Sequence, residues 1–129
     1  MKPLGITPTS IRPPFAHYSH ALLAQTSEVL AISGQLGLRA DDTLPEGALA
    51  QAEVCFANLD AILAAAGMDR SNILRLSAFV TAREHMAGYM AARDVWVAGL
   101  DPAPASTLMI VSGFTRPEFL VEVEALAAR

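Results

Sequence analysis

Two glutamates and a serine–threonine pair near the C-terminus are the residues best suited to chemistry. Glu122 and Glu124 alternate in "LVEVEALA", and Ser106 and Thr107 follow two prolines in a stretch without charge. A carboxylate in a cleft could hold a water molecule or a substrate nitrogen. The simpler interpretation is that the glutamates face water. Spacing alone favours it for both, so Glu124 stays a functional hypothesis.

The distance between these groups depends on how the last two strands pair. A hairpin centred near Thr115 would place Ser106 opposite Glu124 and Leu108 opposite Glu122. Opposed side chains on one face have Cβ atoms roughly 4.5–5.5 Å apart. This register predicts that Ser106 and Thr107 lie beside Glu124 at the open end of a hairpin.

Other candidate groups give weaker signals. His17 and His20 would point to opposite faces of a strand, and His85 lies far away in the sequence, so we expect no metal site. Cys55 lies within an apolar helical pattern, which favours a buried, inert thiol.

The surrounding pattern predicts one α+β domain. Capping-box spacing at Thr43 and Glu46 and again at Thr81 and Glu84 predicts two helix starts, and Gly67 is well placed to end the first helix. Strands are expected within 17–25, 28–34, 72–81, 106–112 and 119–127, after an irregular arm over residues 1–15. Such elements usually pack as one sheet with helices on one face, and a second copy of the chain could cover the other face.

Composition narrows the class of protein. Only 17% of the 129 residues are charged, against about 25% in ordinary domains, which predicts an oligomer that buries apolar surface between subunits. The net charge of −4 and the lack of a basic stretch make nucleic acid an unlikely partner. A single cysteine, no signal-peptide pattern and no membrane-length apolar run predict a cytoplasmic protein.

Taken together, several blocks resemble the RidA/YjgF family, also called L-PSP endoribonuclease-like. They are "HYSHAL", "ISGQLGL", "QAEVCFANLDAILAAAGM", "ILRLSAFVT" and "PAPASTLMIV…RPEFLVEVEALA". The resemblance covers almost the whole chain in order. It implies a fold like that of Bacillus-type chorismate mutase, a homotrimer with ligand clefts between subunits, and cofactor-independent hydrolysis of reactive enamines or imines.

The resemblance also implies roles for particular residues. Glu124 matches the glutamate thought to position water or the imine nitrogen, Tyr18 matches an aromatic residue near the cleft, and Ser33 with Gly34 matches a pair that lines it. Thr107 falls where archetypal deaminases have Cys or Thr.

One position departs from the pattern. Archetypal deaminases carry an arginine before the fifth strand that clamps the substrate carboxylate, whereas this chain has Ala105. Arg12, Arg39 and Arg116 are the alternatives considered, and Arg116 is disfavoured because it lies near the expected hairpin tip. Three functions therefore stay open: a deaminase of altered specificity, a trimer that binds a small metabolite without turnover, and, disfavoured by charge, an endoribonuclease or translation inhibitor.

Overall fold

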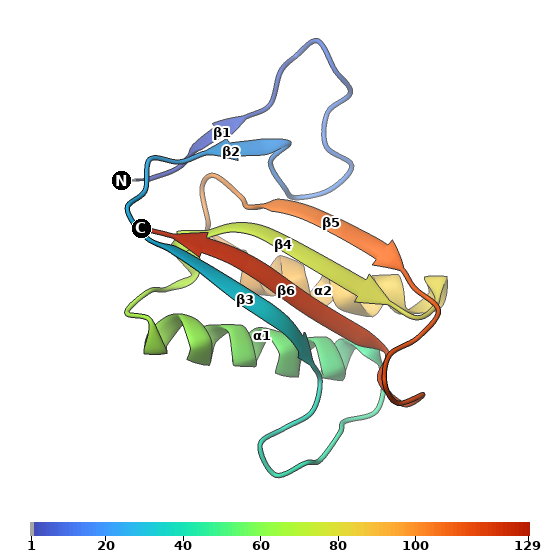
Figure 1. The fold of residues 1–129 in the computed structure, drawn as a ribbon. Coiled ribbons are helices and arrows are strands. Elements are labelled where there is room, and N and C mark those ends of the chain that lie inside the picture. Colours follow the sequence, from blue (N-terminus) through green and yellow to red (C-terminus); the bar gives the residue numbers. More distant parts are fainter. Residues whose placement is uncertain (1) are drawn as a thin grey trace.

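Two helices cover one face of a four-stranded sheet in the computed structural model, which describes residues 2–129 (Figure 1). Short 3-10 turns at Arg70–Asn72 and Arg83–His85 precede β4 and α2. The elements in chain order are β1 (Leu4–Ile6), β2 (Ala21–Leu23), β3 (Val29–Leu36), α1 (Ala48–Ala65), β4 (Ile73–Val80), α2 (Met86–Trp96), β5 (Ala105–Ile110) and β6 (Val121–Ala128).

The strand order of the main sheet is β3-β6-β4-β5. β6 runs antiparallel to both of its neighbours, while β5 runs parallel to β4. The expected hairpin of the last two strands is therefore wrong, because β4 lies between them. The β4–α2–β5 segment forms a β-α-β unit, whose helical crossover makes β5 a parallel neighbour of β4 and leaves the place between β3 and β4 to β6.

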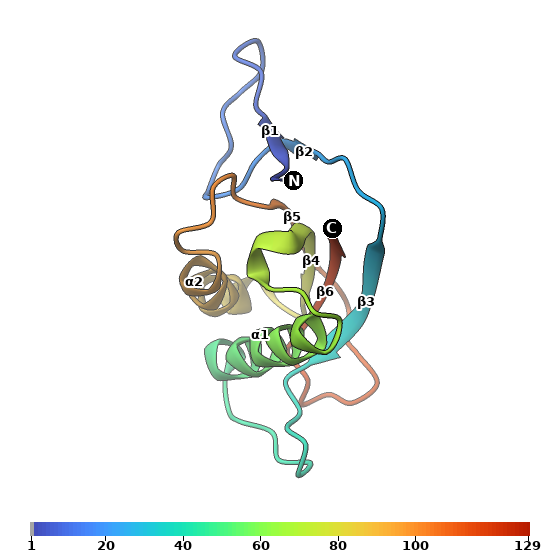
Figure 2. The ribbon, with the colours of Figure 1, turned by 90° about the vertical axis from the view of Figure 1, so that its left-hand side faces the viewer.

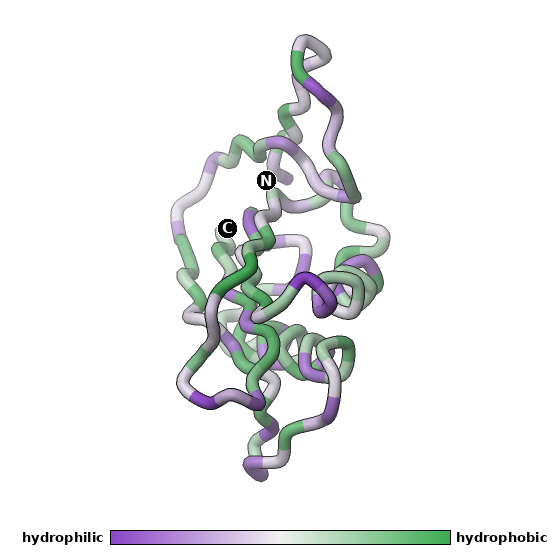
Figure 3. Tube along the Cα trace, turned by 90° about the vertical axis from the view of Figure 1, so that its right-hand side faces the viewer, coloured by the Kyte–Doolittle hydropathy of each residue, from purple (hydrophilic) through white to green (hydrophobic). Residues whose placement is uncertain are grey.

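The main sheet has two faces. The core face packs against the helices and carries buried residues such as Val121 and Val123, and the opposite face, which carries Glu122 and Glu124, is called the open face. Both helices lie on the same side of the sheet (Figure 2). The hydrophobic stretches of the chain follow the strands and helices more than the connecting loops (Figure 3).

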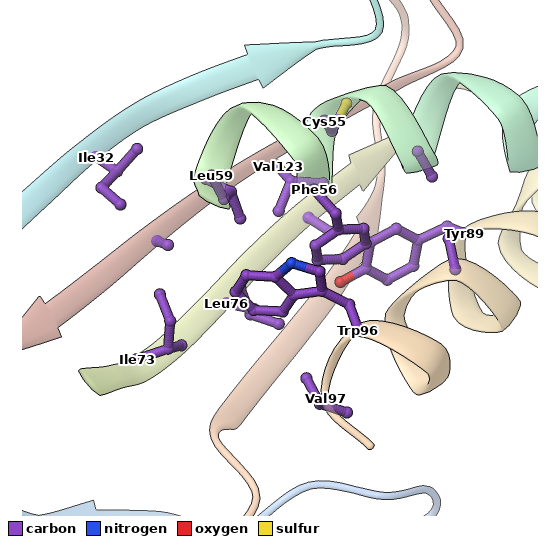
Figure 4. Packing of buried hydrophobic residues seen from close by; sticks show 14 of the residues in the cluster. Ile32, Cys55, Phe56, Leu59, Ile73, Leu76, Tyr89, Trp96, Val97 and Val123 are labelled. Atoms are coloured by element: carbon purple, nitrogen blue, oxygen red, sulfur yellow. The ribbon is translucent and has the colours of Figure 1, made fainter. Parts of the chain in front are cut away.

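The rings of Phe56, Tyr89 and Trp96 meet between the helices (Figure 4). Their centroids lie 5.9 Å apart for Phe56–Tyr89 and 5.0 Å apart for Phe56–Trp96. This cluster places the aromatic side of α2 in the core.

The N-terminal region forms a small sheet of its own. β1 and β2 pair antiparallel, so the arm over residues 1–15 contains a strand that we expected to be irregular chain. The strand expected within 17–25 exists only as Ala21–Leu23, and it does not join the main sheet. Ser19 ties the loop before β2 to the segment before β5, because its backbone N–H donates to Pro104 O and its hydroxyl to Ala103 O.

The helix ends differ from the expected capping boxes. Helix α1 begins after Gly47 without a side-chain cap, and Thr43 instead bonds Asp41 through its backbone N–H and hydroxyl. Gly67, with φ 71°, ends α1 as expected. No capping box forms at Thr81, because a 3-10 turn precedes α2.

By length and composition alone α1 would also suit a membrane span, with a mean hydropathy of 1.3 over 18 residues. This is weak grounds for a membrane assignment, because the core helix of a soluble protein has the same properties. One side of α1 packs into the core here. The buried residues of α1 are Ala48, Gln51, Ala52, Cys55, Phe56, Leu59 and Leu63.

A close approach between the helices gives the first prediction. A Cβ added at Gly88 would lie 2.8 Å from the backbone nitrogen of Leu49 and 3.3 Å from its Cα. Gly→Ala usually stabilises a helix by about 0.5–1 kcal/mol, but overpacking costs about 1–3 kcal/mol. We expect Gly88→Ala to lower the free energy of unfolding in urea by about 1 kcal/mol.

The matched control is Ala87→Gly at the exposed neighbouring position of α2. It should also destabilise, by about 0.5–1 kcal/mol, because it only lowers helix propensity. A stabilised Gly88→Ala variant would show that the helices separate without cost.

Candidate functional site

Glu122 and Glu124 lie on the open face of the sheet. Val121 and Val123 are fully buried beneath the helices, and the period of two along a strand turns the intervening side chains outward. Glu122 is half-buried and Glu124 is exposed. The expectation that the glutamates share a face is confirmed.

Glu124 is flanked by hydroxyl and glycine positions on both sides. Ser77 of β4 lies opposite Glu124 in the register. On the other side, the pairing steps from Ile32–Ala125 to Gln35–Val123, so Ser33 and Gly34 together oppose Glu124 in a β-bulge. The sheet therefore places Ser33 and Gly34 beside Glu124 in the register, but neither residue lines the cavity that contains Glu124.

Thr107 reaches the same face by a different route from the one expected. It lies beside Ser77 in the parallel β4–β5 pair, two strands from Glu124. At about 4.8 Å per strand, Thr107 and Glu124 stand about 10 Å apart across the face. Thr107 and Glu124 were predicted to lie on neighbouring strands, but Ser77 of β4 lies between them.

Ser106 faces the helices, so its predicted pairing with Glu124 is wrong. Its Oγ is buried without a hydrogen-bond partner in the described part of the chain, and so is the Tyr89 hydroxyl. Burial raises the pKa of Tyr89 to about 12, while the Arg93 guanidinium and the Ser106 hydroxyl act in the opposite direction. The two hydroxyls lie near each other without the geometry of a hydrogen bond.

Gly34 leaves room for the Glu122 carboxyl group. A Cβ at Gly34 would lie 2.5 Å from Glu122 Cδ and 2.5 Å from its Oε1. Burial, followed by the negative charge of Glu124, raises the pKa of Glu122. The bulge therefore holds a partly desolvated carboxyl group beside the exposed Glu124.

Arg75 is the residue that sequence reasoning missed. Its Nε donates to Ser77 Oγ at 3.1 Å and its Nη2 donates to Thr107 Oγ1 at 2.7 Å. Arg75 also lies beside Ala105, its register partner on β5. The available signal was the alternation in "ILRLSAFV", where buried Leu76 implies that Arg75 shares the opposite face with Ser77.

A shallow cavity of about 260 Å³ joins these groups on the open face. Arg75, Ser77 and Glu124 contribute its polar lining, while Ala31 and Leu126 contribute apolar surface. The cavity thus combines a cation, a hydroxyl and a carboxylate from two adjacent strands.

The remaining candidates lie elsewhere. Tyr18 is half-buried in the loop before β2, where its hydroxyl accepts from Phe15 N at 3.1 Å, and it does not line the cavity. Arg12 lies over the Phe15 ring, and Arg39 bonds Thr43. Arg116 pairs with Glu118 and lies over Phe119. None of these three arginines lines the cavity.

Cys55 is fully buried, and burial raises the pKa of its thiol to about 12, as expected of an unreactive thiol. Among residues 2–129, no three His, Cys, Asp or Glu side chains are grouped closely enough to hold a metal ion.

The fold and site define an α+β protein with two helices on a mixed sheet. The family model described as "Endoribonuclease L-PSP" matches residues 9–129, so the chain belongs to the RidA/YjgF family. No curated protein matches the sequence.

Solved structures agree with this assignment. YyfB of Yersinia pestis, a protein of unknown function of the conserved Rid family, is 32% identical over 100% of both chains, with a TM-score of 0.88. PA3499 of Pseudomonas aeruginosa, also of unknown function, is 34% identical over 98% of this chain and 92% of its own, with a TM-score of 0.71. RidA of Psychrobacter sp. PAMC 21119 is 26% identical over 98% and 99%, with a TM-score of 0.73.

The raised pKa of Glu122 predicts a pH-dependent stability. The folded state holds this proton more tightly than the unfolded chain does. The Glu122 contribution to the free energy of unfolding is therefore favourable at low pH and is lost as pH rises above the ordinary carboxyl pKa of about 4.3. We expect Glu122→Gln to gain stability relative to the parent between pH 4 and pH 7, measured by urea unfolding.

Glu53→Gln, at an exposed position of α1, is the control for removing one negative charge. A stability difference for Glu122→Gln that is constant with pH, or that shrinks as pH rises, would contradict the assigned cause.

Replacing Ser106 should have little effect on stability, because its buried hydroxyl makes no hydrogen bond. We expect Ser106→Ala to leave the free energy of unfolding within about 0.5 kcal/mol or to raise it. Ser77→Ala is the comparison, since it removes an acceptor of Arg75, and it should cost about 0.5–1.5 kcal/mol. A larger loss for Ser106→Ala than for Ser77→Ala would assign the Ser106 hydroxyl an interaction that the structure lacks.

Proposed function

We propose that the chain is a cofactor-independent enamine or imine deaminase, which hydrolyses a reactive C=N or enamine compound to a carbonyl product and ammonia. The observation that carries this proposal is the placement of Glu124 in a cavity, between the Ser33–Gly34 bulge and Ser77. Membership of the RidA/YjgF family adds support.

Glu124 would act as the general base. It accepts a proton from water while the water oxygen bonds to the imine carbon, and the proton then passes to the nitrogen. The resulting carbinolamine collapses: its hydroxyl proton passes to the nitrogen through Glu124, the C–N bond breaks, ammonia leaves and the carbonyl group forms. Atoms and charge balance without an oxidant, a metal or an organic cofactor.

The proposal includes a homotrimer with the site between subunits. The open face of the main sheet carries exposed Val29 and half-buried Leu126 around the polar groups, and β5 adds exposed Met109. A second copy of the chain packed on this face would bury such apolar side chains and convert the shallow cavity into a cleft.

A second candidate function is small-metabolite binding without turnover. Ala105 in place of the family arginine suits this function equally well, since a cleft without that carboxylate clamp can still hold a different ligand. Ribonuclease activity receives less support: a net charge of −4 and two glutamates on the open face would repel a polyanion.

The decisive variant is Glu124→Gln, which keeps the size of the side chain but removes its basicity. We expect turnover to fall by at least 100-fold, in line with the usual contribution of general-base catalysis. The assay generates imines with an amino-acid oxidase and follows their loss in competition with semicarbazide, across acidic, apolar and non-carboxylate amines.

Light scattering should give the same trimer mass for the parent and for Glu124→Gln, which separates catalysis from assembly. Glu53→Gln is the charge-matched control and should retain turnover. Equal turnover by Glu124→Gln would remove Glu124 from the mechanism. No acceleration of any imine by a well-folded trimer would favour the binding function.

A further inference from the structure

Arg75 projects unneutralised positive charge onto the open face. No carboxylate among residues 2–129 forms an ion pair with it, and the residue is exposed. The guanidinium is nevertheless fixed in place by two hydrogen bonds, to Ser77 and Thr107. A charged side chain that is held rigidly without a counter-charge is suited to receive an anion from solution.

The geometry of these bonds leaves the outer edge of the guanidinium open. Nε and Nη2 occupy one edge in binding the two hydroxyl oxygens. The edge formed by Nη1 and the second Nη2 hydrogen has no acceptor in the described part of the chain. That edge has the fork geometry that matches a carboxylate bidentately.

The two hydroxyl groups extend the donor set. Ser77 Oγ and Thr107 Oγ1 both accept hydrogen bonds from Arg75, so each hydroxyl keeps its own proton for donation. Neither proton is used by another residue within 2–129. Three N–H donors of Arg75 and the two O–H donors of Ser77 and Thr107 therefore remain available, and Arg75 and Ser77 line the cavity.

The glutamates of β6 determine how a bound anion would be oriented in the site. Arg75 turns toward Thr107 on β5 and away from β6, which carries Glu122 and Glu124. An anionic group is attracted to the β4–β5 side and repelled from the glutamates. A ligand with one carboxylate would therefore present its other end to Glu124.

We propose that Arg75, with the hydroxyls of Ser77 and Thr107, forms a carboxylate-binding site at the edge of the Glu124 cavity, where Arg75 and Ser77 line the cavity and Thr107 adjoins them on β5. Because Arg75 is the register partner of Ala105, it supplies a cation from β4 beside the β5 position that lacks one. The ligand class is a small monocarboxylate. The inference shares the cavity of the proposed function but requires only binding, so it survives if the chain proves inactive.

The test measures dissociation constants by NMR titration of the full-length protein with pyruvate and with its neutral amide, pyruvamide. We expect the parent to bind pyruvate at least tenfold more tightly than pyruvamide. Arg75→Ala should lose at least tenfold in pyruvate affinity and leave pyruvamide affinity unchanged. Arg75→Lys should lose less, since it keeps the charge without the fork.

Arg83→Ala is the matched control, because Arg83 lies exposed in the 3-10 turn before α2 and does not line the cavity. It should bind pyruvate like the parent. The double variant Arg75→Ala/Ala105→Arg moves the guanidinium to the neighbouring strand and should recover at least half of the lost fold-change.

Unchanged pyruvate affinity in Arg75→Ala, or equal affinity of the parent for pyruvate and pyruvamide, would overturn the inference. Selective binding of pyruvate by a protein that accelerates no imine would uphold the inference and reject the proposed catalysis. Circular dichroism and light scattering of each variant confirm that the comparison is between folded proteins of equal size.

Discussion

The position of β6 between β3 and β4 is the constraint on which the site depends. Val121 and Val123 are fully buried under the helices. Because side chains alternate along a strand, Glu122 and Glu124 must lie on the other face. A shift of β6 by one residue would bury both carboxylates and expose the valines. Such a shift is strongly unfavourable, because it desolvates two charges and removes apolar burial. The hydrophobic effect on one face thus positions charge on the other.

The local pattern predicted the faces but not the neighbours. Alternation in "LVEVEALA" correctly put Glu122 and Glu124 together, because side-chain direction in a strand has a fixed period. The partner of β6 depends on long-range packing, which no short pattern contains, so the Ser106–Glu124 pairing was wrong. Thr43 had a capping-box sequence, yet it bonds Asp41 in a turn. Arg75 was missed because its significance arises only when β5 is placed beside β4.

The open face keeps opposite charges apart. Arg75 and Glu124 are diagonal neighbours on adjacent strands, a separation of about 7–8 Å between backbone positions that long side chains can bridge. The guanidinium bonds Thr107 instead, which lies on the far side. Two hydroxyl acceptors are enough to hold it there, since an exposed ion pair contributes only about 0.2–1 kcal/mol. The face is consequently dipolar across the strands, with its positive end at β5.

The side-by-side placement of positions 75 and 105 limits how much positive charge this part of the sheet can hold. Neighbouring strands are about 4.8 Å apart, so arginines at both positions would bring two like charges close together. A cation carried by either strand at this level therefore lies over the same part of the open face, so position in the sheet, rather than residue number, decides which side chains are equivalent.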